Sequence, residues 1–274
     1  MYLGIDVGSV TTDAVLLKDE KKIIAFSIVK SGFDHRSAID KVVNDICIKA
    51  QIEREQINSV VSTGYGRRNV VEANKVVTEI SCHAMGIHFL APDIRTVIDI
   101  GGQDSKVIRV SGNGYAETFF MNDKCSAGTG RFLEVMAHAM GIDINELGAI
   151  ALTAKKAEPI SSICTVFAES EVISKIAEGK PKENIIAGLH QAISERLMGM
   201  VAAIGVKKPV ALTGGVAKNQ GIKKALSKYL GEDIYKPEEP QIVGALGAAV
   251  FAMDHYMNGL AKEGNSDSEN KTNE

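Results

Sequence analysis

Short apolar runs separated by glycine-rich turns predict two groups of β-strands. Runs of this kind, rich in Val and Ile and bounded by Gly, are typical of strands. The order strand, glycine turn, strand occurs near the N-terminus and again near residue 100, so the sequence predicts an internal duplication. The first group covers residues 2–8, 14–17, 23–29 and 57–63, and the second covers residues 96–100, a hairpin completed by residues 109–121, and residues 210–213.

Longer segments with apolar residues at helical spacing predict α-helices. Phe132, Leu133, Met136, Ala137 and Met140 fall on one face of such a segment, which follows a glycine-containing loop. A further helix near the C-terminus is built almost entirely from small residues. The expected helices cover residues 34–50, 79–90, 132–140, 182–204 and 244–253.

Three of the expected strands end in glycine turns whose backbone N–H groups could wrap the phosphates of a nucleotide. Asp6 and Asp99 end the strands before the first two turns, where a carboxylate could bind hydrated Mg²⁺ and orient water for hydrolysis. The third turn would let the adenosine end approach the backbone closely. One such turn alone is more typical of an ordinary hairpin, but three in this order are more specific. The candidate nucleotide-binding residues are Ser9, Val10, Thr11, Thr12 and Asp13 in the first turn, Gly101, Gly102, Gln103 and Asp104 in the second, Gly214, Gly215 and Asn219 in the third, and Gln241 further along.

The composition is that of a globular protein and excludes some classes of function. With 274 residues, 45% of them hydrophobic, the chain has material for two domains around one cleft. A formal net charge of −3 leaves no basic excess, so we expect no nucleic-acid binding. No apolar run reaches about 18 residues, so we expect no membrane span, and the N-terminus lacks the pattern of a secretion signal. Four cysteines without close pairing favour reduced thiols in the cytoplasm over disulfides.

Two cysteines, Cys125 and Cys164, lie in similar surroundings that favour a metal site. Each is followed by small or hydroxyl residues and then by a helix-forming run. Helix N-termini attract anions, and the thiolate ligands of a metal are anionic. Because tetrahedral zinc sites and 4Fe-4S clusters usually take four protein ligands, two cysteines make half a site. The chain must therefore supply two more ligands or share the metal across a two-fold axis.

The other two cysteines are weaker candidates for metal ligands. Cys47 falls on the apolar face of the helix expected at residues 34–50, which is typical of a core residue. Cys82, His83 and His88 could bind a metal together. However, the two histidines are five positions apart, and this spacing does not place them on one helical face.

Taken together, the three glycine turns resemble the phosphate-1, phosphate-2 and adenosine motifs of the ATPase superfamily of actin, heat-shock chaperones and sugar kinases. The resemblance implies an α/β, actin-like ATPase fold with two duplicated domains hinged around ATP. We expect the first domain at residues 1–95 and the second at 96–258, with the terminal helix packing back on the first. We expect a disordered tail at residues 259–274, where the composition turns to Gly, Asn, Ser, Asp, Glu and Lys.

Within that superfamily, residues 121–133 and 161–174 resemble the activators of 2-hydroxyacyl-CoA dehydratases, which are grouped with the ATPase subunits of benzoyl-CoA reductase. In that family a homodimer holds one 4Fe-4S cluster through two cysteines of each subunit, and Cys125 and Cys164 match those positions. The resemblance implies an ATPase that passes a low-potential electron to a dehydratase or related reductase component, with a ferredoxin or flavodoxin upstream. This chain departs from the family pattern at Asp13, where many members carry a lysine. A contact between a lysine and phosphate is therefore not expected at this position.

The residues alone leave two other functions of this fold open. One is a small-molecule kinase in which Asp99 or Asp104 is the base for a substrate hydroxyl, and the other is an ATP-switched chaperone or scaffold. The resemblance favours the redox function. On that function, ATP is expected to gate electron transfer by a hinge motion transmitted through the helices after Cys125 and Cys164, without direct contact between nucleotide and cluster.

Overall fold

The computed structural model describes residues 1–18, 22–161 and 164–270, and its description of side chains ends at residue 261. The chain divides into two compact units. Unit 1 comprises Met1–Phe89 together with the segment from Ile242 onward, and unit 2 comprises Leu90–Gln241. The expected first domain ended at residue 95, whereas this division falls between Phe89 and Leu90.

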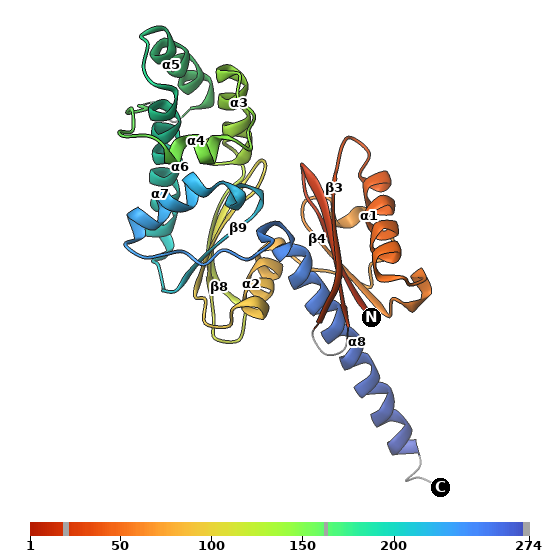
Figure 1. Ribbon diagram of the computed structural model, residues 1–274. Helices are drawn as coiled ribbons and strands as arrows, with labels where there is room; N and C mark the ends of the chain where they lie inside the picture. Colours follow the sequence, from red (N-terminus) through yellow and green to blue (C-terminus); the bar gives the residue numbers. More distant parts are fainter. Residues whose placement is uncertain (19–21, 162–163, 271–274) are drawn as a thin grey trace. The chain divides into compact units, whose positions relative to one another are not determined.

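Unit 1 is a five-stranded sheet with helices on both faces (Figure 1). Its strand order is β3-β2-β1-β4-β5, in which β1 is antiparallel to β2 and parallel to β4. The strands are β1 (Tyr2–Val7), β2 (Thr11–Lys18), β3 (Lys22–Lys30), β4 (Ser59–Thr63) and β5 (Lys75–Val76), and the helices are α1 (His35–Ala50), η1 (Arg54–Gln56), η2 (Arg67–Asn69), α2 (Glu79–Leu90) and α8 (Val243–Asn270).

The central strand β1 explains why this unit needs both of its long helices. Successive side chains of a strand point to opposite faces. Leu3, Ile5 and Val7 are buried in one core cluster with the apolar face of α1. On the other face, the ring of Tyr2 lies 5.8 Å from that of Tyr256 on α8. The alternation along one strand therefore holds α1 and α8 on opposite sides of the sheet.

Close packing of α8 depends on glycine. A Cβ atom at Gly4 would collide with the backbone of Ala245 and Ala249, so only glycine lets the helix approach β1 this closely. This contact between α8 and β1 agrees with the expectation that the terminal helix packs on the first domain. Helix α8 continues through residues 259–270 of the expected disordered tail, and residues 271–274 lie outside the described residues. Once the apolar part of a helix is held by packing, each added residue gains a backbone hydrogen bond at little cost.

Unit 2 is a four-stranded sheet covered by a cluster of helices. Its strand order is β8-β7-β6-β9, in which β6 is antiparallel to β7 and parallel to β9. One continuous core joins the sheet to α3, α5, α6 and α7. The strands are β6 (Thr96–Ile100), β7 (Ser105–Val110), β8 (Ala116–Asn122) and β9 (Val210–Thr213), and the helices are α3 (Gly130–Met140), α4 (Leu147–Leu152), α5 (Thr165–Ala177), α6 (Lys182–Ile204), η3 (Gly215–Lys218), α7 (Gln220–Leu230) and η4 (Pro240–Ile242).

Most of the expected helices and strands are present with similar bounds. Helix α1 begins one residue after Asp34, whose carboxylate accepts hydrogen bonds from the backbone of Arg36 and Ser37, as an N-cap does. The strand patterns near residues 2 and 96 begin the two sheets, so the predicted duplication is confirmed. Within the described residues, no helix combines the length and apolar character needed to cross a membrane.

Candidate functional site

The first glycine turn, between β1 and β2, is closed by short hydrogen bonds. The N–H of Gly8 donates to the carbonyl of Thr11 at 2.9 Å, and Ser31 donates through Oγ to the Gly8 carbonyl at 2.7 Å. The hydroxyl of Thr12 lies 3.0 Å from Ser31 Oγ and is fully buried, so this side chain supports the turn from inside. Val10 is exposed at the tip, where a phosphate could approach the backbone.

Asp6 lies beside this turn at a point where two glycines leave room for its carboxylate. A Cβ atom at Gly64 would collide with Asp6 Oδ1, and one at Gly244 would collide with Oδ2. Gly64 also has a φ of +86°, a conformation that residues with a Cβ rarely adopt. His83 lies at the same place, because the Cβ position of Gly244 is 3.2 Å from its Nε2. The sequence reasoning identified Asp6, and it named His83 as a possible metal ligand with Cys82 and His88, but it did not place Gly64, Gly244 or His83 beside Asp6.

Asp13 stands directly opposite Asp6 in the register of β1 and β2. Residues opposite each other in an antiparallel pair project on the same face, about 5 Å apart at Cβ. Thr11 Oγ1 donates to Asp13 Oδ2 at 3.3 Å. The first turn therefore combines two carboxylates with hydroxyl donors, a set of oxygen ligands suited to Mg²⁺.

The second turn, between β6 and β7, has the same backbone closure but a different charge pattern. The N–H of Gly101 donates to the carbonyl of Asp104 at 3.0 Å. Lys106 Nζ lies 2.6 Å from Asp104 Oδ2 and 3.3 Å from Asp99 Oδ2, and all three side chains are more than nine-tenths buried. Thr213 donates through Oγ1 to Asp99 Oδ1 at 2.8 Å. Lys106 thus neutralises part of the carboxylate charge here, and sequence reasoning did not single it out.

The third turn brings together most of the residues expected at an adenosine end. Gly214 has a φ of +85° and donates its N–H to the carbonyl of Pro240 at 2.9 Å. The Cβ position of Gly215 lies 3.8 Å from Gln241 Oε1, which also accepts from Lys218 Nζ at 3.1 Å. Asn219 begins α7 by accepting from the backbone N–H of Ile222 at 3.2 Å. Gln241 therefore lies beside the third turn, a position that the sequence did not assign to it.

The two candidate cysteines lie at neighbouring loops of unit 2. Cys164 is the N-cap residue of α5 and is exposed, whereas Cys125 is partly buried in the loop before α3. The residues that follow them are joined directly, since Ser126 Oγ lies 2.8 Å from Thr165 Oγ1. Ser162 and Ile163, which belong to the segment 161–174 around Cys164, lie outside the described residues. The structure thus brings together two segments 39 positions apart in the sequence.

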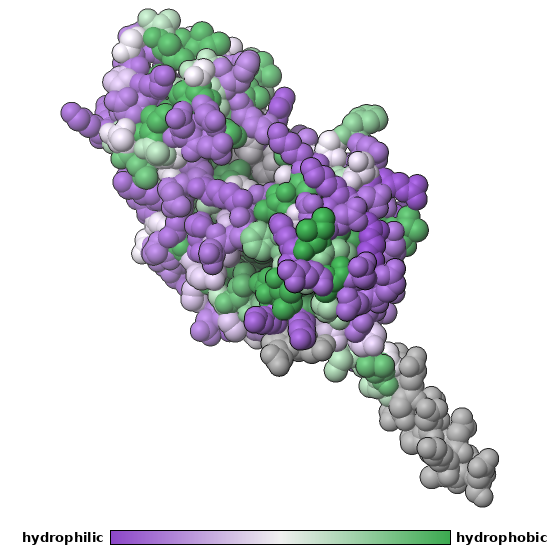
Figure 2. Space-filling model, turned by 45° about the vertical axis from the view of Figure 1, so that its right-hand side comes forward, coloured by the Kyte–Doolittle hydropathy of each residue, from purple (hydrophilic) through white to green (hydrophobic). Residues whose placement is uncertain are grey.

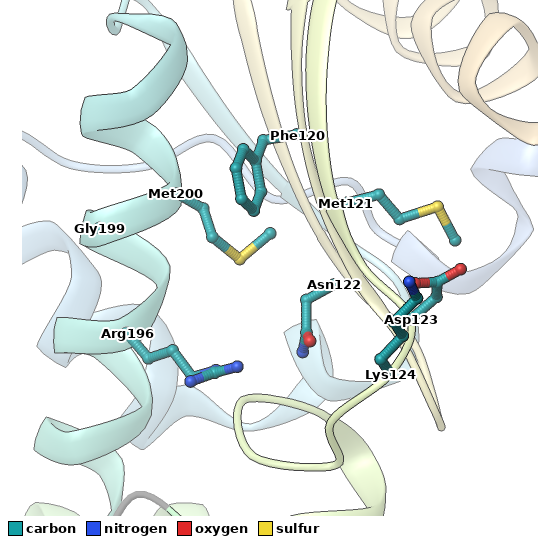
Figure 3. A pocket seen from close by; sticks show the side chains of 8 residues that line it. All are labelled: Phe120, Met121, Asn122, Asp123, Lys124, Arg196, Gly199 and Met200. Atoms are coloured by element: carbon teal, nitrogen blue, oxygen red, sulfur yellow. The ribbon is translucent and has the colours of Figure 1, made fainter.

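The loop that carries Cys125 is shaped by the end of β8 and by α6. Asn122 donates through Nδ2 to the carbonyls of Cys125 at 2.8 Å and Ala127 at 3.3 Å. Gly128 has a φ of +86°, and its Cβ position is 3.2 Å from Arg196 Cδ. Figure 3 shows the cavity of 460 Å³ beside this loop, with Arg196 and Met200 projecting from α6 toward Asn122. These contacts hold the backbone around Cys125 in one conformation.

The other two cysteines differ in environment from this pair. Cys82 is fully buried in α2, and burial raises the pKa of its thiol to about 12. Burial also raises the pKa of Cys47, which packs against the core of unit 1. Both thiols remain protonated at neutral pH, as expected of core residues. Among the described residues, no group of three or more His, Cys, Asp and Glu side chains could hold a metal, so Cys125 and Cys164 remain half a site.

The first turns of α5 expose an apolar surface next to Cys164. Phe167 is 67% exposed and Val166 is 68% exposed, and Ile173 and Ile176 are also exposed on this helix. Figure 2 shows hydrophobic residues gathered at the end of unit 2 that carries α3 and α5. Exposed aromatic and aliphatic residues in such a group are typical of a protein interface.

Comparison with known proteins identifies the family. Residues 3–252 match the model of the BadF/BadG/BcrA/BcrD ATPase family. The chain is 46% identical to the 2-hydroxyisocaproyl-CoA dehydratase activator of Clostridioides difficile, over 93% of this chain and 96% of the relative. It is 48% identical to the activator of lactoyl-CoA dehydratase of Anaerotignum propionicum, over 93% of this chain and 98% of the relative.

A solved structure supports the same conclusion. The activator of the 2-hydroxyisocaproyl-CoA dehydratase from Clostridium difficile with bound ADPNP superposes with a TM-score of 0.91 at 44% identity, covering 96% of this chain and 98% of that one. The prediction of an α/β, actin-like ATPase fold is confirmed, and so is the predicted resemblance to dehydratase activators. The chain belongs to the BadF/BadG/BcrA/BcrD ATPase family.

Proposed function

We propose that this protein is an ATP-dependent electron donor that activates a 2-hydroxyacyl-CoA dehydratase or a related CoA-thioester reductase. The functions of the relatives support the activator part, because two of them activate dehydratases of this class. We further propose that the protein works in the cytoplasm and is itself reduced by a ferredoxin or flavodoxin. The cytoplasmic location rests on the four cysteines without close pairing, and the upstream donor rests on the family resemblance.

The electron carrier in this proposal is one 4Fe-4S cluster held by Cys125 and Cys164 of each of two chains. The observation that carries the proposal is the hydrogen bond between Ser126 and Thr165, because it holds the two cysteine loops side by side. Thiolates are the usual ligands of such clusters. Both thiols are at least partly accessible, so they suit a cluster shared with a second copy. When bound, the cluster supplies transfer of single electrons at low potential.

The exposed apolar residues of α5 support a homodimer. Phe167 lies only three residues after Cys164, so a partner chain that covers this surface would also approach the cysteine. Cyclic dimers use the same surface on both subunits, which places two copies of each loop near the two-fold axis. Four thiols then meet where one chain supplies two.

The nucleotide in this proposal is ATP with Mg²⁺. Asp6 and Asp99 are proposed to hold the metal and orient the attacking water, with the backbone of the first and second turns binding phosphate. Asp13 adds a second carboxylate beside Asp6. Gly214, Gly215, Asn219 and Gln241 are proposed to bind the adenosine end.

A direct backbone connection supports coupling between nucleotide and cluster. The first residues of α3 donate to the second turn, with Gly130 N–H to the Gly101 carbonyl at 2.9 Å and Arg131 N–H to the Gly102 carbonyl at 2.8 Å. A Cβ atom at Gly130 would lie 3.2 Å from the Gly101 carbonyl oxygen, so glycine permits this approach. The loop of Cys125 leads straight into α3. A shift of the second turn that accompanies ATP binding would therefore move the segment after Cys125.

Anaerobic purification followed by iron and sulfide determination tests the redox function. We expect a brown protein with four iron and four sulfide per dimer, the content of a 4Fe-4S cluster. Cys125→Ser and Cys164→Ser should lose the cluster, while the matched controls Cys47→Ser and Cys82→Ser should keep it. A colourless wild-type protein, or full iron content in either of the first two variants, would contradict the proposal. Colourless protein that phosphorylates a small hydroxyl compound would instead identify the kinase alternative.

A further inference from the structure

A second cavity in unit 2 lies between α4, α6 and α7 and shares no lining residue with the cavity beside the loop of Cys125. Its volume is 460 Å³, within the range of small-molecule sites. Alanines line much of it, including Ala151 on α4, Ala187 on α6 and Ala225 on α7. Such short side chains leave apolar space suitable for a flat organic group.

Four lysines surround this cavity. Lys155 and Lys156 follow α4, and Lys224 and Lys228 are one helical turn apart on α7. In the part of the chain whose side chains are described, none of the four forms an ion pair with a carboxylate. The whole chain carries a formal charge of −3, so this positive charge is a local feature. Four cations around one cavity repel each other, and a bound anion would remove that repulsion.

A buried hydrogen-bond donor lies in the wall of the same cavity. His190 is 2% exposed, and its Nε2 lies 3.2 Å from Asn219 Nδ2. Because Asn219 Oδ1 accepts from the backbone of Ile222, its amide must donate to His190 Nε2. Burial lowers the pKa of His190 to about 4, so the ring is neutral and its proton sits on Nδ1. Among the described residues, Nδ1 has no hydrogen-bond partner, and it is packed against Gly221, where an added Cβ atom would collide with it. His190 therefore shapes the wall of the cavity without being exposed in it.

We propose that this cavity binds a nucleotide that carries two or more phosphates. A phosphate monoester has a charge of about −1.5 to −2 at pH 7, so four lysines match at least two phosphates. The alanine lining would contact the base or another apolar part of the ligand. Two sources share this chemistry: free ADP, and coenzyme A, which combines an adenine nucleotide with a third phosphate. The site lies outside the three glycine turns, although its wall residue His190 is hydrogen-bonded to Asn219 of the third turn, and it does not depend on the proposed redox function.

Calorimetric titration of the full-length protein tests this site. Coenzyme A is titrated into protein already saturated with ADP and Mg²⁺, and ADP is titrated separately to count sites per chain. We expect coenzyme A to bind the saturated protein, or ADP to occupy two sites, and the arm that responds identifies the source. The double variant Lys224→Gln, Lys228→Gln should weaken this binding at least about tenfold.

Two further variants keep the test decisive. Lys155→Gln with Lys156→Gln removes the same charge from the segment after α4, so an effect on the folding of α7 is distinguishable from lost binding. Lys180→Gln with Lys182→Gln makes the same charge change at exposed positions of unit 2 and should leave the affinity unchanged. The proposal would be overturned if coenzyme A does not bind and ADP fills only one site. It would also be overturned if both cavity variants bind like the control.

Discussion

The two units repeat one strand arrangement around an aspartate at the end of a central strand. In unit 1, Asp6 on β1 is aligned with Thr63 on the parallel strand β4. In unit 2, Asp99 on β6 is aligned with Thr213 on the parallel strand β9. Each of these threonines is followed by a glycine in the left-handed region, with φ of +86° and +85°. The two halves of the duplication therefore share their backbone in detail.

The charges around the two aspartates differ. At the position opposite Asp99, unit 2 has Lys106, which pairs with Asp99 and Asp104 in a buried cluster. At the corresponding position opposite Asp6, unit 1 has Asp13. A lysine thus stands opposite the central aspartate of one turn, whereas a second aspartate stands opposite that of the other. The acidic residues of the first turn are therefore suited to bind a divalent cation from solution. In the second turn, the ion pairs of Lys106 with Asp99 and Asp104 already hold the carboxylates in place.

Replacing the two aspartates separates metal binding from structural support. We expect Asp6→Asn and Asp99→Asn each to lower ATPase turnover by about a hundredfold while the cluster stays bound. Only Asp99→Asn should also lower the free energy of unfolding, because it disturbs the buried ion cluster. ATPase assays and urea titrations of the same preparations check both statements. Wild-type turnover in either variant would remove that aspartate from the catalytic role.

Replacing Lys106 tests whether this lysine stabilises the buried carboxylates of the second turn. Lys106→Met leaves Asp99 and Asp104 buried without their lysine, so we expect a loss of about 3–5 kcal/mol in the free energy of unfolding. Lys180→Met, at an exposed position, is the control and should change stability little. If both variants unfold at the same urea concentration, the buried cluster contributes nothing and the comparison between the turns is wrong.

The buried His190, which is hydrogen-bonded to Asn219 of the third turn, predicts that the stability of unit 2 depends on pH. Burial lowers the pKa of His190 from 6.5 to about 4, so between these values the unfolded state binds more protons than the folded state. Stability from this group is therefore present above pH 6.5 and is lost as pH falls toward 4, by about 3 kcal/mol in total. His190→Gln should flatten this part of the profile relative to the control His138→Gln. Parallel profiles for the two variants would contradict it.

We expect the smallest effect when Asp13 of the first turn is replaced by lysine, the residue at the corresponding position of the second turn. Asp13→Lys places a cation opposite Asp6, so without Mg²⁺ we expect stability to rise by about 1 kcal/mol because a like-charge pair is removed. The same variant should need more Mg²⁺ for half-maximal ATPase activity. Thermal unfolding with and without Mg²⁺ measures the first effect. Unchanged stability together with unchanged Mg²⁺ demand would show that Asp13 does not act on Asp6.

Periodicity predicted the helices and strands well, because the buried faces of α1, α3 and β1 follow regular spacing. The duplication was also readable from the repeated strand and glycine turn. Gly64 was recoverable in the same way, because it follows β4 as Gly214 follows β9. Lys106 was harder to find, since a lysine in a strand normally indicates a solvated position and its burial depends on Asp99 and Asp104.

Other features of the site depended on tertiary contacts that spacing does not reveal. The hydrogen bond between Ser126 and Thr165 joins distant segments, and Gly244 leaves room for Asp6 from the far end of the chain. The boundary at Ile242 follows from the return of α8 to the first sheet, and the boundary at Phe89 lies at the end of α2. The length of α8 was underestimated because polar composition indicates solvation and does not by itself end a helix.

The central claim is that the second turn transmits the nucleotide state to Cys125 through the start of α3. The most direct test follows the rate at which a chelator removes iron from the anaerobic protein without nucleotide, with ADP and with ATP. We predict that ATP changes this rate in the wild-type protein and that Gly130→Ala, which crowds the Gly101 carbonyl, reduces the difference while ATPase activity remains. Equal rates in all three nucleotide states of the wild-type protein would contradict the account.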